Sequence, residues 1–261
     1  MRCAFLLITV LLIAGCVQIP IPAGRMNATQ PEQGGQPEQP PFFSQPKPDD
    51  RDAGGLNHEY LQPGREVIVE IDYASGHEPA AATKNKIADF FRRNAGKSVT
   101  FSGGNVIEAT KNVYAVSDLL AIEKENRNHY TSGSTAVVYV LSVNGNFEQS
   151  GALGVVYKAS TIALFPERMQ DATSALVLYP QIEKAVTIHE LGHLMGLVNI
   201  NYKSERDHED AAHRGHSKND ESVMYWAVED ISLKNLLALG PPSEFDEDDL
   251  LDLQKIREGV Y

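Results

Sequence analysis

The sequence predicts an α/β fold of the α+β kind, in which a twisted mixed sheet carries helices on one or both faces. Segments with the period of strands alternate along the chain with segments with the period of helices, and this alternation is typical of sheets covered by helices. One segment, TAVVYVLSV at 135–143, is almost continuously apolar, as strands buried on both faces are. The part of the chain from Leu56 to Tyr261 is long enough for one domain with a sizeable core.

Each element is predicted from a local pattern. The segment EVIVEIDY at 66–73 alternates apolar and polar residues, and this period of two predicts a strand. Further strands are expected from short apolar or alternating runs at 98–101, 155–164 and 174–179. Helices are expected from apolar residues spaced three and four apart at 80–93, 116–125 and 181–197. In the first of these helices, the residues expected to face inward are Ile87, Phe90 and Phe91.

A last helix is expected near the end of the chain. Ser243 is followed three residues later by an acid, which is the pattern of a helix cap. The helix should run through Arg257, and the acidic run 246–249 should stabilise its positive N-terminal end. Its inner face is expected to carry Phe245, Leu250, Leu253 and Ile256.

The segment HELGH at 189–193 places two histidines and a glutamate on the helix expected at 181–197. His189 and His193 are four residues apart, so they share one face of a helix and can bind one zinc ion. Glu190 can act as a general base toward a water that the metal activates. Zinc lowers the pKa of such a water to about 7, which supplies hydroxide at neutral pH. This is the chemistry of peptide hydrolysis.

A solvated helix face could also carry these three residues without any metal. Their surroundings favour the metal, because an apolar stripe offset from the histidines lets the helix pack while its ligands face a cleft. The stripe consists of Ala185, Ile188, Leu191, Gly192 and Met195. Gly196 then stands where a helix needs a left-handed residue to end.

Together with a later segment, this helix resembles that of the metzincin metalloproteases, whose signature is HExxHxxG, a third ligand and a later turn carrying a methionine. His189, Glu190, His193 and Gly196 match the signature, and SVMYW at 222–226 looks like the Met-turn. The resemblance implies a zinc-dependent endopeptidase with an active-site helix and a smaller C-terminal subdomain that ends in a helix. It also implies that Met224 forms a hydrophobic floor beneath the ligands, and that an edge strand, here 155–164, aligns an extended substrate.

The third metal ligand departs from this signature, because the chain has Asn199 at its position and a neutral amide is a poor zinc donor. Archaemetzincins show H-C-x4-C-x-M in this region, and His216 has the same spacing to Met224, with serines in place of both cysteines. We therefore expect His216 to be the third ligand. The alternatives are His213, His208, Asn199 acting through a water, and Glu221.

The histidine-rich stretch between Asn201 and Glu221 has two other interpretations. It could be a flexible, solvated loop rich in charge. Its acidic residues, Asp207 and Asp210 among them, could also hold calcium through their carboxylate oxygens.

The start of the chain predicts a lipoprotein signal sequence. An apolar run at 5–14 follows Arg2 and is much shorter than the roughly 20 residues that a helix needs to span a bilayer. The run ends in IAGC, which looks like a lipobox with Cys16 as the lipidated residue. A simple signal peptide is the alternative. We expect a signal peptide at 1–15, a disordered tether rich in Pro, Gln and Gly at 16–55, and a catalytic domain at 56–261.

Charge and cysteine content restrict the function further. The formal net charge of −12 argues against nucleic acid as a partner, because nucleic-acid binding requires a basic surface. The two cysteines are Cys3, inside the signal peptide, and Cys16, so the mature domain has no disulfide and no thiol that could block a metal.

These observations predict an extracytoplasmic zinc-dependent endopeptidase that is anchored to a membrane by lipid on Cys16, at the cell surface or in a periplasm. Its expected partners are a peptide or protein substrate and the membrane. The alternative is a surface lipoprotein that binds zinc or a peptide without turnover, a pseudoprotease. A purely structural surface protein would require the Glu190 motif to be accidental.

Overall fold

A computed structural model of the chain describes residues 47–149, 151–230 and 240–260. The predicted signal peptide, the predicted lipidation site Cys16 and the tether up to residue 46 lie outside the described residues. Within the described ranges, no helix is long and apolar enough to cross a membrane.

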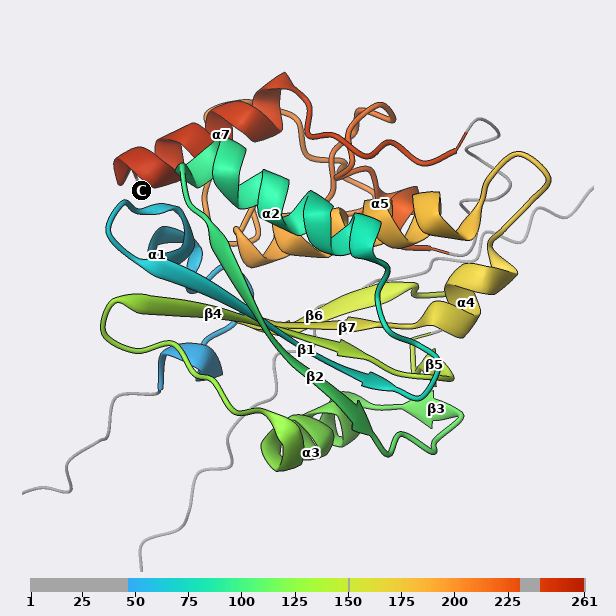
Figure 1. Cartoon of the computed structure of the whole chain (residues 1–261). Helices are drawn as coiled ribbons and strands as arrows, with labels where there is room; N and C mark the ends of the chain where they lie inside the picture. Colours follow the sequence, from blue (N-terminus) through green and yellow to red (C-terminus); the bar gives the residue numbers. More distant parts are fainter. Residues whose placement is uncertain (1–46, 150, 231–239, 261) are drawn as a thin grey trace, which may run out of the picture. The chain divides into compact units, whose positions relative to one another are not determined.

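The centre of the domain is a five-stranded mixed sheet with the strand order β2-β1-β4-β7-β6 (Figure 1). Its strands are β1 (Glu66–Ala74), β2 (Val99–Ile107), β4 (Thr135–Ser142), β6 (Gly154–Lys158) and β7 (Thr161–Leu164). The first four strands of this order are parallel, with Val69 opposite Val138 and Val140 opposite Ile162. Strand β6 pairs antiparallel with β7 and forms one edge of the sheet. The mixed α/β fold predicted from the sequence is therefore confirmed.

Two strand predictions were wrong. The single strand expected at 155–164 is a hairpin, because the chain turns at Ala159 and Ser160 and Lys158 comes to lie opposite Thr161. Neither residue is a glycine or proline, so the local sequence gives no sign of the turn. The strand expected at 174–179 is instead a turn in which Ser174 N donates to Val177 O at 2.9 Å. A separate two-stranded sheet pairs β3 (Val113–Tyr114) with β5 (Asn146–Phe147).

Helices cover both faces of the five-stranded sheet (Figure 1). The helices are α1 (Asn57–Leu61), α2 (Ala81–Ala95), α3 (Val116–Asn126), α4 (Pro166–Asp171), α5 (Tyr179–Leu194) and α7 (Glu247–Glu258). Helices α2, α5 and α7 lie on one face, and α3 lies on the other. The larger apolar core lies between the first group and the sheet, and includes Ile87, Phe90 and Phe91 of α2, as predicted. A smaller core lies on the α3 side around Leu119.

Helix α7 begins later than predicted. Its cap is Asp246, whose Oδ1 accepts hydrogen bonds from the backbone N–H groups of Asp248 and Asp249, and not Ser243. An aspartate with two free backbone donors in reach is a strong cap. Leu250 is 45% exposed and not on the inner face as predicted, whereas Leu253 and Ile256 are buried as expected.

Residues 47–55, at the end of the segment predicted to be a tether, contact the rest of the described chain. The 3₁₀ helix η1 (Pro48–Asp50) carries Asp49, which is buried and lies 2.8 Å from Nη2 of Arg127. The same guanidinium lies 2.7 Å from Glu123. A buried cation with two buried carboxylates ties this segment to α3, and no local pattern in 47–55 indicates it.

Candidate metal centre

The two predicted histidines, His189 and His193, and Glu190 lie in the buried C-terminal half of helix α5. Its apolar side packs into the core, and His189, Glu190 and His193 are themselves 0%, 0% and 8% exposed. The rings of His189 and His193 lie with centroids 4.6 Å apart. After the helix, Gly196 adopts φ +74°, the left-handed conformation that the sequence predicted for the helix end.

The predicted Met-turn lies directly against this helix. Met224 is fully buried, and a Cβ added to Gly192 would lie only 2.3 Å from its sulfur. Gly192 is therefore the point at which helix and turn touch. The turn also orients a histidine, because the Val223 carbonyl lies 2.7 Å from His189 Nδ1. With that nitrogen donating to a carbonyl, Nε2 is left with its lone pair free for a metal.

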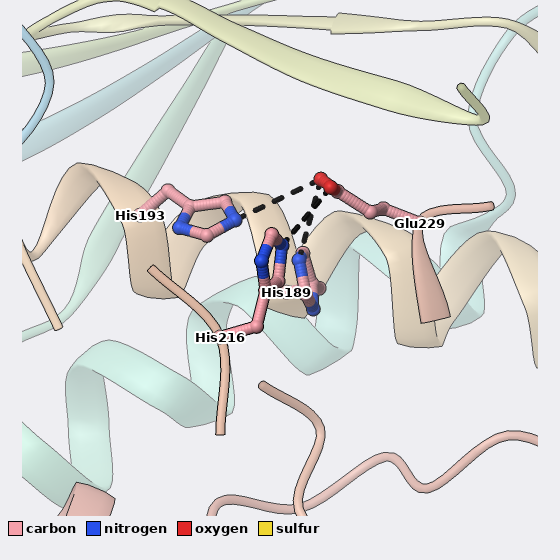
Figure 2. Close-up of side chains that lie close together, drawn as sticks. All are labelled: His189, His193, His216 and Glu229. Atoms are coloured by element: carbon pink, nitrogen blue, oxygen red, sulfur yellow. Dashed lines mark ion pairs between the residues drawn. The ribbon is translucent and has the colours of Figure 1, made fainter. Parts of the chain in front are cut away.

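The loop before the Met-turn brings His216 to the same place (Figure 2). Its ring centroid lies 5.2 Å from that of His189 and 5.0 Å from that of His193. The loop is held by Glu209, whose carboxylate accepts from the Gly215 N–H at 3.0 Å. Ser217 N donates to the Met224 carbonyl at 2.8 Å, so the turn and the histidine are fixed together. The structure thus gathers the three predicted histidines at one point.

The alternatives for the third ligand lie elsewhere. Asn199 has φ +65° and uses its side chain to accept from Ser204 N and donate to Glu209, so it closes the loop. His213 stacks on Trp226 with centroids 4.2 Å apart and bonds Asp210. His208 is buried, with its ring nitrogens 3.6 Å from Asp249 Oδ1 and 3.2 Å from Asp252 Oδ2. The exposed Glu221 is not grouped with the three histidines.

The calcium hypothesis is not supported. Asp210 accepts from His213 and Ala212, and Asp207 pairs with Lys218 at the surface. These carboxylates therefore face different partners and do not converge on one point.

A residue that the sequence did not single out completes the cluster. Glu229, at the end of the 3₁₀ helix η2 (Trp226–Val228), places its carboxylate among the three rings (Figure 2). Its Oε2 lies 3.4 Å from His189 Nε2 and 3.7 Å from His193 Nε2, and its Oε1 lies 2.9 Å from His216 Nε2. Only its position just after the Met-turn could have drawn attention to it.

The electrostatics of the cluster follow from burial and from these contacts. Burial alone would raise the pKa of Glu229, but the attraction of the three imidazole rings around its carboxylate outweighs burial and holds the pKa well below its usual range. Burial lowers the pKa of His193 to about 4, so its ring is neutral at neutral pH. A neutral imidazole is the form that binds a metal.

The donor set fits zinc. Ligand atoms of the three histidines and Glu229 all lie within 4.8 Å of one another. Within the described part of the chain, Nε2 of both His189 and His216 is buried without a hydrogen-bond partner. Buried polar atoms without partners are costly and indicate a ligand that satisfies them. Imidazole and carboxylate donors are those that zinc takes in proteins.

Glu190 lies beside this cluster and faces the edge strand. A Cβ added to Gly154, the first residue of β6, would lie 2.7 Å from Glu190 Oε1. Both carboxylate oxygens are buried, and neither has a hydrogen-bond partner among the residues described. Burial, and secondly the nearby Glu229, raise the pKa of Glu190 well above its usual value. An unpartnered carboxyl with a raised pKa is suited to take and return a proton.

A solved structure has a similar fold. The chain is similar to the crystal structure of archaemetzincin from Methanopyrus kandleri, with 14% identity and a TM-score of 0.51 over 76% of this chain and 99% of that one. Two further similar structures each match 71% of this chain and 99% of their own. They are an archaemetzincin from Archaeoglobus fulgidus complexed with malonate, with 15% identity and a TM-score of 0.43, and a zinc-dependent peptidase from Methanocorpusculum labreanum, with 13% and 0.47.

No protein-family model matches the sequence, and no curated protein matches it. The similarity is therefore carried by the arrangement of the elements. The chain has an archaemetzincin-like fold, a central mixed sheet with helices, and its three histidines converge within that fold.

Proposed function

We propose that this chain is a zinc-dependent endopeptidase in which His189, His193 and His216 hold the metal. The observation that carries the proposal is the convergence of three histidines from two separate segments beside Glu190, a buried carboxyl without a described partner. The likeness of the fold to an archaemetzincin structure supports it.

The chain's residues have distinct roles in this reaction. Bound zinc supplies a Lewis acid that polarises the scissile carbonyl and lowers the pKa of the attacking water. Glu190 takes the proton of that water as general base and returns it to the leaving amine as general acid. Met224 forms the apolar floor against α5 and keeps the helix in place. The Val223 carbonyl holds the ring of His189 in one orientation.

The substrate is an extended peptide that pairs with β6. This strand is at the edge of the sheet, and its first residue lies against Glu190. Main-chain hydrogen bonds to an edge strand give affinity with little sequence preference. A peptide aligned there would pass its backbone in front of the general base.

The enzyme acts outside the cytoplasm, tethered to a membrane by lipid on Cys16. This part of the proposal rests on the apolar run at 5–14 and the IAGC string that follows it. Mass spectrometry of the mature N-terminus would test it, since the proposal predicts an acylated Cys16 as the first residue. An unmodified N-terminus would contradict it.

The function is tested by replacing Glu190 with Gln in the full-length chain. We expect the wild type to bind one zinc and to cleave casein in a chelator-sensitive way, and Glu190→Gln to bind zinc but lose cleavage. The matched control is Glu221→Gln, because Glu221 is an exposed glutamate in the same region and should leave cleavage unchanged. Cleavage by Glu190→Gln at the wild-type rate would refute the role of Glu190.

A pseudoprotease that binds zinc without turnover is the second candidate. The observation that favours it is Glu229, whose carboxylate stands where a substrate carbonyl would have to approach the metal. One zinc per chain without cleavage of any unstructured protein would support this alternative.

A further inference from the structure

Glu229 lies among the three histidines but is not placed as an ordinary hydrogen-bond acceptor. Its oxygens are 2.9 Å from His216 Nε2 and 3.4 Å from His189 Nε2. Neither nitrogen makes a hydrogen bond of acceptable geometry to any residue that the structure describes. The carboxylate oxygens and the ring nitrogens therefore converge on one point without forming hydrogen bonds to one another.

The distances match those between ligands of one tetrahedral metal. With zinc–nitrogen and zinc–oxygen bonds of about 2.0–2.2 Å, two ligand atoms on a tetrahedron lie about 3.3–3.6 Å apart. Glu229 Oε2 lies 3.4 Å from His189 Nε2 and 3.7 Å from His193 Nε2, close to the tetrahedral value, and the other oxygen, Oε1, lies 2.9 Å from His216 Nε2. The carboxylate is therefore placed where a fourth ligand would be.

We propose that Glu229 is a fourth protein ligand of the zinc centre and closes it in the resting state. The inference rests on the proposed function, because it takes the three histidines as the zinc site. Catalytic zinc sites keep one position open, whereas structural sites fill all four with protein ligands. Glu229 must therefore leave before a substrate carbonyl can reach the metal, which makes the side chain a gate within the site.

The backbone around Glu229 allows this exchange by rotation of the side chain alone. The Glu229 carbonyl accepts from Leu153 N at 2.7 Å, and Asp230 forms an antiparallel bridge with Ala152. These contacts hold Glu229 next to the start of β6. The side chain itself is 28% exposed, so solvent can receive the carboxylate. A peptide that pairs with β6 would reach the metal beside Glu229 and displace it.

The test compares the full-length wild type with Glu229→Gln and Glu229→Ala, with Glu221→Gln as the matched control. Zinc affinity is measured by competition with a chromophoric chelator. The accessibility of the fourth position is measured by titrating the cobalt(II)-substituted proteins with acetohydroxamate and following the visible absorption of the metal. Neither readout depends on peptidase activity. Glu229→Gln is close in shape to the wild type, so it remains informative if Glu229→Ala does not fold.

The two readouts should move in opposite directions. We expect both Glu229 variants to bind zinc at least about tenfold more weakly, since even residues that only support a ligand cost 10–100-fold when changed. We expect the same variants to bind acetohydroxamate more tightly, because the fourth position is open, and Glu221→Gln to match the wild type in both.

Unchanged zinc and hydroxamate affinities in a wild type that binds one zinc would overturn the role of Glu229 and leave the proposed function standing. Weaker hydroxamate binding by the Glu229 variants would also overturn it, because Glu229 would then help the anion to bind. A wild type that binds no zinc would refute the zinc site itself, and this inference with it.

Discussion

The contact between Gly192 and Met224 gives a sharp test of how the Met-turn supports helix α5. We predict that Gly192→Ala destabilises the chain, although alanine is a better helix former than glycine. A Cβ at this position would lie 2.3 Å from Met224 Sδ and 3.1 Å from both Met224 Cε and Phe245 Cε1. The methyl group has no space unless the methionine moves.

The expected magnitude combines two opposing effects. Overpacking a well-packed core costs about 1–3 kcal/mol, and replacing glycine by alanine inside a helix gains about 1 kcal/mol. The net loss in the free energy of unfolding should be about 1–2 kcal/mol, because the contact is far inside van der Waals range and only the flexible end of Met224 can yield. Met224→Ala alone should cost about 2–5 kcal/mol through the cavity that it leaves.

The stability of the Gly192→Ala/Met224→Ala double variant tests this contact directly. With the sulfur removed, the methyl of Gly192→Ala enters vacated space and the overpacking cost disappears, so the double variant should lose less than the sum of the single losses by about 2–3 kcal/mol. The assay is urea unfolding of the chelator-treated full-length proteins, so that zinc affinity does not contribute. If the loss of the double variant equals the sum of the two single losses within about 0.5 kcal/mol, the proposed contact is refuted. A Gly192→Ala variant more stable than the wild type would refute it as well.

Three further predictions concern the rest of the domain. Asn199→Ala should lower the free energy of unfolding by about 2–3 kcal/mol in thermal denaturation, because it removes two loop hydrogen bonds from a left-handed residue. The variant should still bind one zinc per chain, and loss of zinc would make Asn199 a ligand. Arg127→Met should lower the free energy of unfolding by roughly 3–5 kcal/mol in urea, since it leaves the buried carboxylates of Asp49 and Glu123 without their cation. A change below about 1 kcal/mol would show that this buried ion pair contributes little to stability. Burial raises the pKa of Asp249 from 3.8 to about 7, so the folded chain keeps a proton that the unfolded chain loses between these values. The contribution of this group to stability should fall as pH rises through that window, and Asp249→Asn should flatten the profile of urea midpoints; an unchanged slope would contradict the assignment.

Much of the active helix could be predicted from the sequence because its signals are local. The spacing of His189 and His193, the glycine that ends the helix, and the distance from His216 to Met224 are all fixed along the chain. The loop between Asn199 and His216 did not obscure the third histidine, because the match runs backward from the Met-turn. The sequence predicts the cap of α7 at Ser243 and the structure places it at Asp246, because serine and aspartate both cap helices and the local sequence does not distinguish them.

The features that were missed depend on contacts distant in the sequence. Glu229 is held near the histidines by the pairing of Glu229 and Asp230 with Ala152 and Leu153, and no pattern near Glu229 indicates that pairing. The hairpin of β6 and β7 turns without glycine or proline, so its two strands looked like one. The contact of residues 47–55 with the rest of the chain depends on the ion pair between Asp49 and Arg127 of a distant segment.

The proposed function depends on one zinc ion bound among His189, His193 and His216. The most direct measurement is anomalous X-ray diffraction at the zinc absorption edge from crystals of the zinc-loaded protein. We expect one strong peak between the three imidazole rings, next to Glu229 and within reach of Glu190. A peak beside His208 and Asp249 alone, or no peak in protein loaded with excess zinc, would contradict this zinc site.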